Sequence, residues 1–201
     1  MGIQSDVQVG FIADENAADP DRLVTAARPN TSATMATTTF LGGGARNVTV
    51  TTTGTGDNAK TCTITGTDVF GNSITEVIVS TGSAEAVAGA KLFLTVSGVE
   101  CSAQYAANIT VGSGSLCASA VAGGNRTRMK GYSIVSAGTA GLVDFYNGTP
   151  EDGTIIFKAQ TIGTDNTTID NTIPDEGILF DSGLAISYTV ATVVLANIFF
   201  A

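Results

Sequence analysis

Histidine and tryptophan are both absent from this chain of 201 residues. Without histidine, a serine or cysteine nucleophile lacks the base that most often activates it, and a zinc site lacks one of its commonest ligands. Without tryptophan, a sugar-cleaving site lacks its usual aromatic platform. These absences disfavour a hydrolase and a metal centre, so we expect no enzyme activity, no cofactor and no small-molecule substrate.

Basic residues are few, with 9 lysines and arginines against 18 aspartates and glutamates. The resulting net charge of −9 repels a phosphate backbone, so general binding of nucleic acid is disfavoured. The same charge keeps a threonine-rich surface in solution. Because no acidic run is longer than two residues, we prefer this simpler interpretation of the charge.

Cysteine is scarce, and its three occurrences, Cys62, Cys101 and Cys117, show no CxxC spacing. Cys62 alternates with Ile64, as a small buried side chain does in a strand. We therefore predict three reduced cysteines in the core. One disulfide with a spare thiol is the alternative.

Long apolar runs are also missing, since no segment approaches the roughly 18 residues that a membrane-crossing helix needs. The N-terminus has neither the basic nor the apolar region of a signal peptide. The sequence therefore predicts no membrane partner. It also predicts a protein that is made and kept in the cytoplasm unless it leaves as part of a larger assembly.

Threonine and glycine are abundant, with 30 and 24 residues respectively. Threonine and valine suit a pleated, half-buried strand, glycine and asparagine suit turns, and strong helix formers are scarce. The predicted fold class is all-β. We expect two small sandwich-like or jelly-roll-like units after an extended arm: the arm at 1–44, a first β unit at 45–122, a linker at 123–130 and a second β unit at 131–201.

Local patterns add detail to this plan. Asp19 and Pro20 stand at the cap and first position of one or two helical turns in 19–27. Segment 91–99 predicts one half-buried strand, and the glycine-rich segment 112–124 predicts a flexible connector. Asn147 and Gly148 predict a hairpin because both tolerate positive φ. The arm has few large apolar side chains, so we expect a neighbouring subunit to hold it in place.

Two sets of acidic residues are candidates for chemistry. Asp144 and Glu76 lie in apolar strands, where a buried carboxyl would have a raised pKa, but strand alternation favours outward-pointing side chains. A second, loop-rich set offers oxygen ligands for calcium, although its spacing does not fit a DxDxDG loop and turn formation explains it equally well. Its members are Asp165, Asp170, Asp175, Glu176 and Asp181.

The order of motifs in the first β unit resembles structural proteins of tailed-bacteriophage virions. The resemblance rests on a hairpin TITGTD-x-x-GN-x-x-TE, a strand K-x-F-x-TV and a closing ITVG, found here at 63–68, 71–72, 75–76, 91–96 and 109–112. The second unit resembles the small β-sandwiches of similar proteins, and the likeness spans about residues 45–200. It implies a capsid decoration (cement) protein, or a neck, tail or fibre part, with no catalytic residues. The implied partners are the major capsid protein and copies of the chain itself, as a homotrimer in the virion.

Interface residues are expected in three places under this hypothesis. The arm and the apolar end of the chain would lock neighbouring subunits together. Segment 123–130 holds the only cationic cluster, which would grip an acidic surface on a partner, although a solvated linker explains it as well. The candidates are Phe11, Ile12, Arg22, Arg28, Phe40, Arg126, Arg128, Lys130, Phe199 and Phe200.

Two other functions remain open. A carbohydrate-binding module in a receptor-binding fibre should show surface aromatics near loops, and the available tyrosines are Tyr105, Tyr132, Tyr146 and Tyr188. A tail-associated glycan hydrolase should show paired carboxylates in a cleft, for which Asp144 and Glu76 are the candidates.

Overall fold

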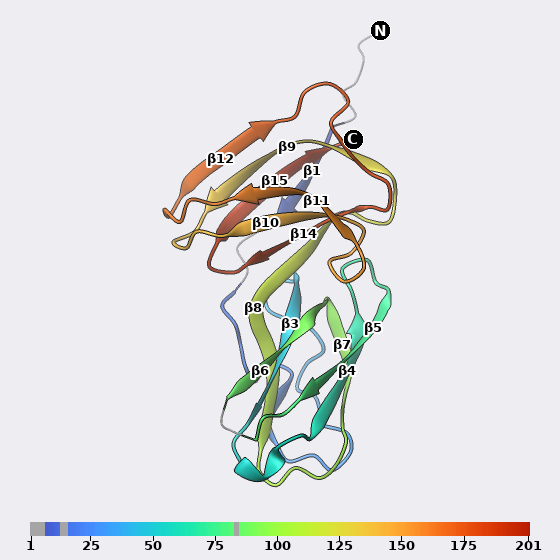
Figure 1. Cartoon of the computed structure of the whole chain (residues 1–201), viewed down its shortest axis with the longest axis vertical. Helices are drawn as coiled ribbons and strands as arrows, with labels where there is room; N and C mark the ends of the chain where they lie inside the picture. The colour runs from blue at the N-terminus through green and yellow to red at the C-terminus, as the bar shows by residue number, and fades with distance from the viewer. Residues whose placement is uncertain (1–6, 13–15, 83–84) are drawn as a thin grey trace. The chain divides into compact units, whose positions relative to one another are not determined.

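The computed structural model describes residues 7–12, 16–82 and 85–201 and is built almost wholly of β-strands (Figure 1). Its contacts divide the chain into two compact units. One, here called the central unit, is Asn16–Cys117. The other, the terminal unit, combines Met1–Glu15 with Ala118–Ala201.

The terminal unit contains a sheet in the order β1-β15-β9-β12, with β13 also paired to β9. A second set of paired strands runs β11-β10-β14. Neighbouring strands in both sets are antiparallel. The bounds are β1 (Gln8–Ile12), β9 (Thr127–Ser136), β10 (Leu142–Asn147), β11 (Thr154–Gln160), β12 (Thr167–Thr172), β13 (Ile178–Phe180), β14 (Leu184–Thr189) and β15 (Val193–Phe200).

The central unit contains a three-stranded sheet in the order β5-β4-β7, and a second group in which β2 pairs with β8 and β3 lies between β8 and β6. A short 3-10 helix, η1 (Thr55–Asp57), precedes β4. The strands are β2 (Val24–Ala27), β3 (Ala45–Thr52), β4 (Thr61–Thr67), β5 (Ser73–Val79), β6 (Ala86–Phe93), β7 (Thr95–Cys101) and β8 (Ile109–Ala122), the last of which continues past the boundary between the units.

Each unit has its own apolar core. In the central unit, side chains of the β5-β4-β7 sheet, such as Ile64 and Val99, pack with Val48 of β3 and Ile109 of β8. In the terminal unit, the ring of Tyr132 on β9 lies 6.0 Å from that of Phe145 on β10. Face-to-face packing of two sheets is the architecture of a β-sandwich, so the predicted all-β, sandwich-like class is confirmed.

The N-terminal segment, by which we mean residues 1–44, does not form a separate arm in its described residues. β1 pairs with β15 in the terminal unit, where the blue and dark-red strands lie side by side in Figure 1. β2 pairs with β8 in the central unit, and Leu23 and Val24 are fully buried there. A few well-placed apolar side chains and backbone hydrogen bonds therefore hold the described residues of 1–44 in the fold of their own chain, in place of the neighbouring subunit that the sequence predicts for this role.

The helical turns expected in 19–27 do not form. Asp19 accepts a backbone hydrogen bond from Ser113, and the N–H of Leu23 donates to Val111, both on β8. These long-range bonds hold the segment extended, and Val24 begins β2. Tertiary pairing outweighs the local preference of the Asp-Pro pair for a helix start.

The glycine-rich segment 112–124 is also not a connector, because most of it belongs to the 14-residue strand β8. A Cβ at Gly112 would collide with the backbone of Asp19 and Pro20, and one at Gly114 would lie 2.5 Å from the side chain of Asn47. These glycines allow neighbouring chain segments to approach closely. They do not make the strand flexible.

Two further sequence predictions differ in detail. Segment 91–99 forms the end of β6 and the start of β7, with a break at Leu94, and Phe93 is fully buried. The hairpin at Asn147 and Gly148 does form, between β10 and β11, but its loop is longer than the two residues of a tight turn. The linker expected at 123–130 is shorter, because β9 begins at Thr127.

Candidate functional site

Exposed apolar side chains gather on strands at the edges of sheets. β1, β11 and β5 each end a row of hydrogen-bonded strands. Each carries two large apolar side chains that are at least a third exposed. These pairs are Val9 and Phe11 on β1, Val77 and Val79 on β5, and Ile155 and Ile156 on β11.

The edge formed by β1 is the most apolar of the three. Alternation along the strand turns Gly10 and Ile12 inward, where Gly10 lies against Val121, and turns Val9 and Phe11 outward. Phe11 is 67% exposed. Phe199 of β15 lies directly opposite Val9 and so shares its outward face.

We call Val9, Phe11 and Phe199 the β1 patch. The opposite edge of the same sheet, β12, has the sequence TTIDNT and exposes polar side chains. Charged and polar edges are a common protection against pairing with another chain, and β1 has no charged residue. This sheet therefore has an apolar edge at β1 and a polar edge at β12.

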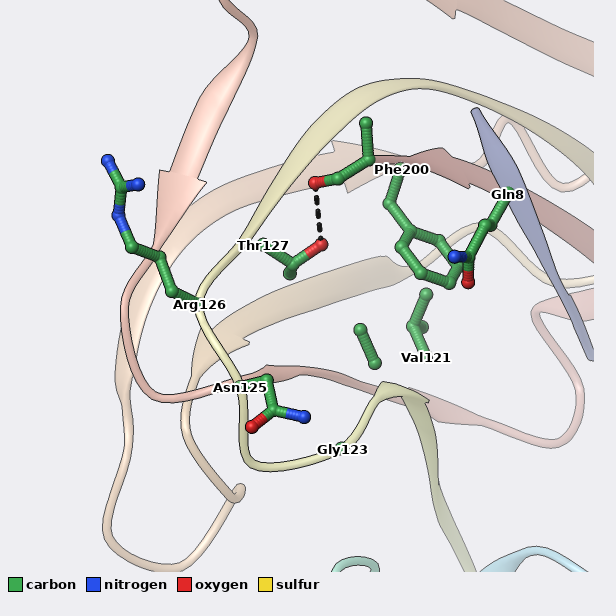
Figure 2. Close-up of a pocket in the computed structure, with 9 residues that line it drawn as sticks. Gln8, Val121, Gly123, Asn125, Arg126, Thr127 and Phe200 are labelled. Carbon is green, nitrogen blue, oxygen red and sulfur yellow. Dashed lines mark hydrogen bonds between the residues drawn. The ribbon is translucent and has the colours of Figure 1, made fainter. Parts of the chain in front are cut away.

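A hollow of about 390 Å³ opens beside the inward face of β1 in the terminal unit (Figure 2). The ring of Phe200 and the amide of Gln8 lie next to each other on one side, and Asn125 lies across the hollow. Thr127 is held by a hydrogen bond of 3.1 Å from its hydroxyl to the carbonyl of Ala201. Arg126 lines the rim, but its guanidinium is turned away from the Phe200 ring.

The cationic cluster at 126–130 is largely occupied by contacts within the chain. Arg126 lies 3.5 Å from Asp181, with both side chains exposed, and Arg128 lies 3.8 Å from Glu176. Lys130 donates to the backbone carbonyls of residues 175 and 176. The exposed ion pairs are weak and screened by salt, so Arg126 can exchange its partner easily.

The candidate residues of the N-terminal segment divide into buried and accessible ones. Ile12 is 4% exposed and Phe40 is 5% exposed, so neither side chain can contact a partner, and for these two the interface expectation does not hold. Arg22 donates to the carbonyl of Thr39 at 3.3 Å, and Arg28 donates to that of Tyr105 at 2.8 Å. Arg28 therefore ties this segment to the loop between β7 and β8, whereas the bond of Arg22 lies within the segment itself.

The paired-carboxylate hypothesis finds no support in the geometry. Asp144 and Glu76 belong to different units. Asp144 forms an ion pair of 3.1 Å with Lys158, its cross-strand neighbour on β11. Glu76 on β5 accepts a hydrogen bond of 2.7 Å from the N–H of Ala90 and weaker ones from Lys91, which ties β5 to β6. Both carboxylates are engaged in holding strands together.

The acidic residues considered for calcium do not converge. Among the residues that the structure describes, no group of three or more acidic, cysteine or histidine side chains is placed to hold a metal ion. Two of the acidic side chains, Glu176 and Asp181, face arginines instead.

The tyrosines expected on the surface of a sugar-binding module are mostly inside. Tyr105, Tyr132 and Tyr188 are each less than a tenth exposed. Tyr146 is half-buried and accepts a hydrogen bond of 3.3 Å from Ser187. Among the aromatic side chains that the structure describes, Phe11 is the most exposed, and Phe70, Tyr146, Phe157, Phe199 and Phe200 are half-buried.

One buried charged residue was not predicted from the sequence. Arg46, at the start of β3, is 1% exposed. Its guanidinium donates twice to the carbonyl of Gly114, at 3.2 and 2.7 Å, and once to that of Asn16 at 2.7 Å. It therefore fastens the start of the central unit to β8. The sequence signal for its burial is weak: three glycines at 42–44 precede Arg46 and allow the chain to turn toward the core.

No known protein family, no curated protein and no solved structure matches this chain. Within the described ranges, no helix is long and apolar enough to cross a membrane.

Proposed function

We propose that this chain is a non-enzymatic structural protein of a tailed-phage virion, and in particular a capsid decoration (cement) protein that stabilises the head shell. It would be assembled in the host cytoplasm onto the major capsid protein. The observation that carries the proposal is the placement of exposed apolar side chains on the edge strands β1, β5 and β11. This observation supports the motif resemblance from an independent direction.

Leaving such edges uncovered is unfavourable for a protein in solution. A strand at a sheet edge presents unpaired backbone groups, and natural monomers protect it with charged residues, proline or a covering segment. β1 has none of these side chains and adds the β1 patch beside its open edge. Burying Phe11 and Val9 against a neighbour would remove apolar surface from water, which is the main driving force of stable association.

Net charge fits the same role. A chain of charge −9 avoids nonspecific attachment to packaged nucleic acid, and its contacts with other subunits would be made by the uncharged strand β1. Cement proteins add buried area across a shell without chemistry, and β-sandwich units with exposed apolar side chains on their edge strands are suited to this.

Copy number tests the proposal directly. Quantitative mass spectrometry of purified virions should find this chain in numbers comparable to the major capsid protein. A few copies per particle would place it in a neck or tail ring and overturn the cement assignment. Absence from the particle would overturn the virion proposal as a whole.

The alternative is a neck or tail adaptor, or a fibre protein with a carbohydrate-binding role. The hollow in Figure 2 favours it, because an aromatic ring beside amide side chains is an arrangement that binds sugars. A glycan array probed with the purified chain separates the two proposals. Binding that is lost in Phe200→Ala but kept in Phe11→Asp would support the fibre role.

A further inference from the structure

Two buried cysteines face each other across neighbouring strands of the central unit. Cys62 on β4 lies directly opposite Cys101 on β7, and their sulfur atoms are 3.7 Å apart. Both side chains are almost completely excluded from solvent.

The backbone bonds around the two cysteines define the kind of pair they form. The N–H of Cys101 donates to the carbonyl of Thr31, and the N–H of Ser102 donates to that of Thr61. Cys62 and Cys101 therefore do not exchange ladder bonds with each other. In such a non-hydrogen-bonded pair of an antiparallel sheet, the facing side chains approach most closely.

This geometry fits a disulfide without movement of the strands. Directly opposed residues in an antiparallel pair have Cα atoms about 4.5–5.5 Å apart, within the range of about 4.4–6.8 Å that disulfides use. Small rotations about the Cα–Cβ bonds would bring the sulfurs together. Cys117, on β8, has its sulfur 3.7 Å from the carbonyl of Ser115.

We propose that Cys62 and Cys101 are an oxidation site that forms an intramolecular disulfide, with a low-molecular-weight disulfide such as oxidised glutathione as the oxidant. The thiolate of one cysteine attacks one sulfur of the oxidant, so that the oxidant's S–S bond breaks and one thiolate leaves. The thiolate of the other cysteine then attacks the sulfur of the first and releases the second thiolate of the oxidant. The cysteines lose two electrons to the oxidant, and their two protons are taken up by the released thiolates.

Polar groups surround the two thiols and change their acidity. The hydroxyl of Tyr105 lies 3.2 Å from the Cys62 sulfur and 3.0 Å from the Ser80 hydroxyl. Hydrogen bonding from Cys101 lowers the pKa of the Cys62 thiol, against the opposing effect of burial, and Tyr105 lowers it further. The same contact with Cys62, together with burial, raises the pKa of Cys101.

The bond would close a loop between residues 39 positions apart, a loop that includes β5 and β6. Closing a loop of this length restricts the unfolded chain, so we expect the oxidised central unit to melt on the order of 10 °C higher than the reduced one. The sandwich itself need not change, because the strands already stand in register.

Thiol counting tests the proposal on the wild-type chain. The reduced protein is incubated with oxidised glutathione, denatured, and titrated with a chromogenic disulfide reagent. We expect two of the three thiols to disappear, a mass lower by two hydrogens, and a linked peptide pair containing Cys62 and Cys101. Persistence of three thiols, stable glutathione adducts, or a linkage to Cys117 would each overturn the proposal.

Variants provide the matched control. Cys117→Ser should still lose two thiols and should show the same rise in melting temperature on oxidation. Cys62→Ala and Cys101→Ala should each show no such rise. If oxidation raised the melting temperature equally in those two variants, the disulfide would not be its cause.

Discussion

At the residue scale, Arg46 is the clearest case of a side chain whose role comes from its partners. The charge is buried, yet three hydrogen bonds to backbone carbonyls satisfy it. Buried carbonyls that lose their donors cost about 1–3 kcal/mol each, and truncation also leaves a cavity. We therefore expect Arg46→Ala to lower the free energy of unfolding by roughly 3–5 kcal/mol.

Urea titration followed by circular dichroism measures this change. Arg126→Ala is the control, because that side chain is exposed and its ion pair with Asp181 is long, so the change should stay within about 0.5 kcal/mol. An equal effect of both substitutions would contradict the role given to Arg46.

Asp57 is a second residue whose environment predicts a measurable effect, in this case a dependence on pH. Burial raises the pKa of its carboxyl, but Lys60 at 2.8 Å and the N–H groups of Ala106 and Ala107 outweigh burial and hold the pKa below the ordinary 3.8. A depressed pKa contributes stability that is fully present above the ordinary value. That contribution is lost as the pH falls through the lower pKa of the folded chain.

We therefore expect Asp57→Asn to be less stable than the wild type at neutral pH. Its free energy of unfolding should also fall less steeply than that of the wild type below about pH 4. Denaturant titrations at a series of pH values check this. Parallel pH profiles for the two proteins would contradict it.

At the element scale, the contact between the N-terminal segment and β8 is the feature most open to test. A Cβ at Gly112 would collide with the backbone of Asp19, Pro20 and Asp21. Because these are backbone atoms, the collision cannot be relieved by the rotation of a side chain. Gly112→Ala should push this segment away from β8, expose Leu23 and Val24, and cost about 1–3 kcal/mol.

Hydrogen exchange at the amides of β2 should report the change, together with unfolding titrations. Gly98→Ala is a matched strand substitution, because nothing lies within 4 Å of a Cβ there. It should be neutral or stabilising by up to about 1 kcal/mol. Unchanged protection of β2 in Gly112→Ala would show that the segment is held elsewhere.

At the scale of the whole molecule, the N-terminal segment is part of the fold, so the assembly proposal is better tested by a point substitution than by a deletion. Removing residues 1–44 would delete β1 and β2 and take Leu23, Val24 and Phe40 out of the core, so loss of binding would reflect loss of the fold. A point change on the β1 patch leaves both units intact. We expect Phe11→Asp to weaken attachment to capsid shells by at least about tenfold, since it places an unpaired charge in an apolar contact.

Co-sedimentation of the purified chain with empty shells measures the attachment. Thr168→Asp, on the polar edge β12 of the same sheet, is the control and should bind as the wild type does. Equal binding by both variants would exclude the β1 patch as the attachment surface.

Local residue preferences were sufficient to predict the all-β class and several of the turns. The hairpin from Thr61 to Val79 is an example: the carboxylate of Asp68 accepts hydrogen bonds from the N–H groups of Phe70 and Asn72, and Gly71 supplies the positive φ. Such a turn is complete within five residues, so its signal can be read in order along the chain.

The positions of the N-terminal segment, the glycines of β8 and the cysteines depend instead on tertiary contacts. The segment looked like an arm because its few apolar residues gain their value from β8 and β15, which lie far away in the sequence. Cys62 and Cys101 form a pair only because β4 and β7 are antiparallel in one register, and a shift of one residue would separate them. Contacts between distant segments are set by the packing of whole strands, and a local pattern does not contain that information.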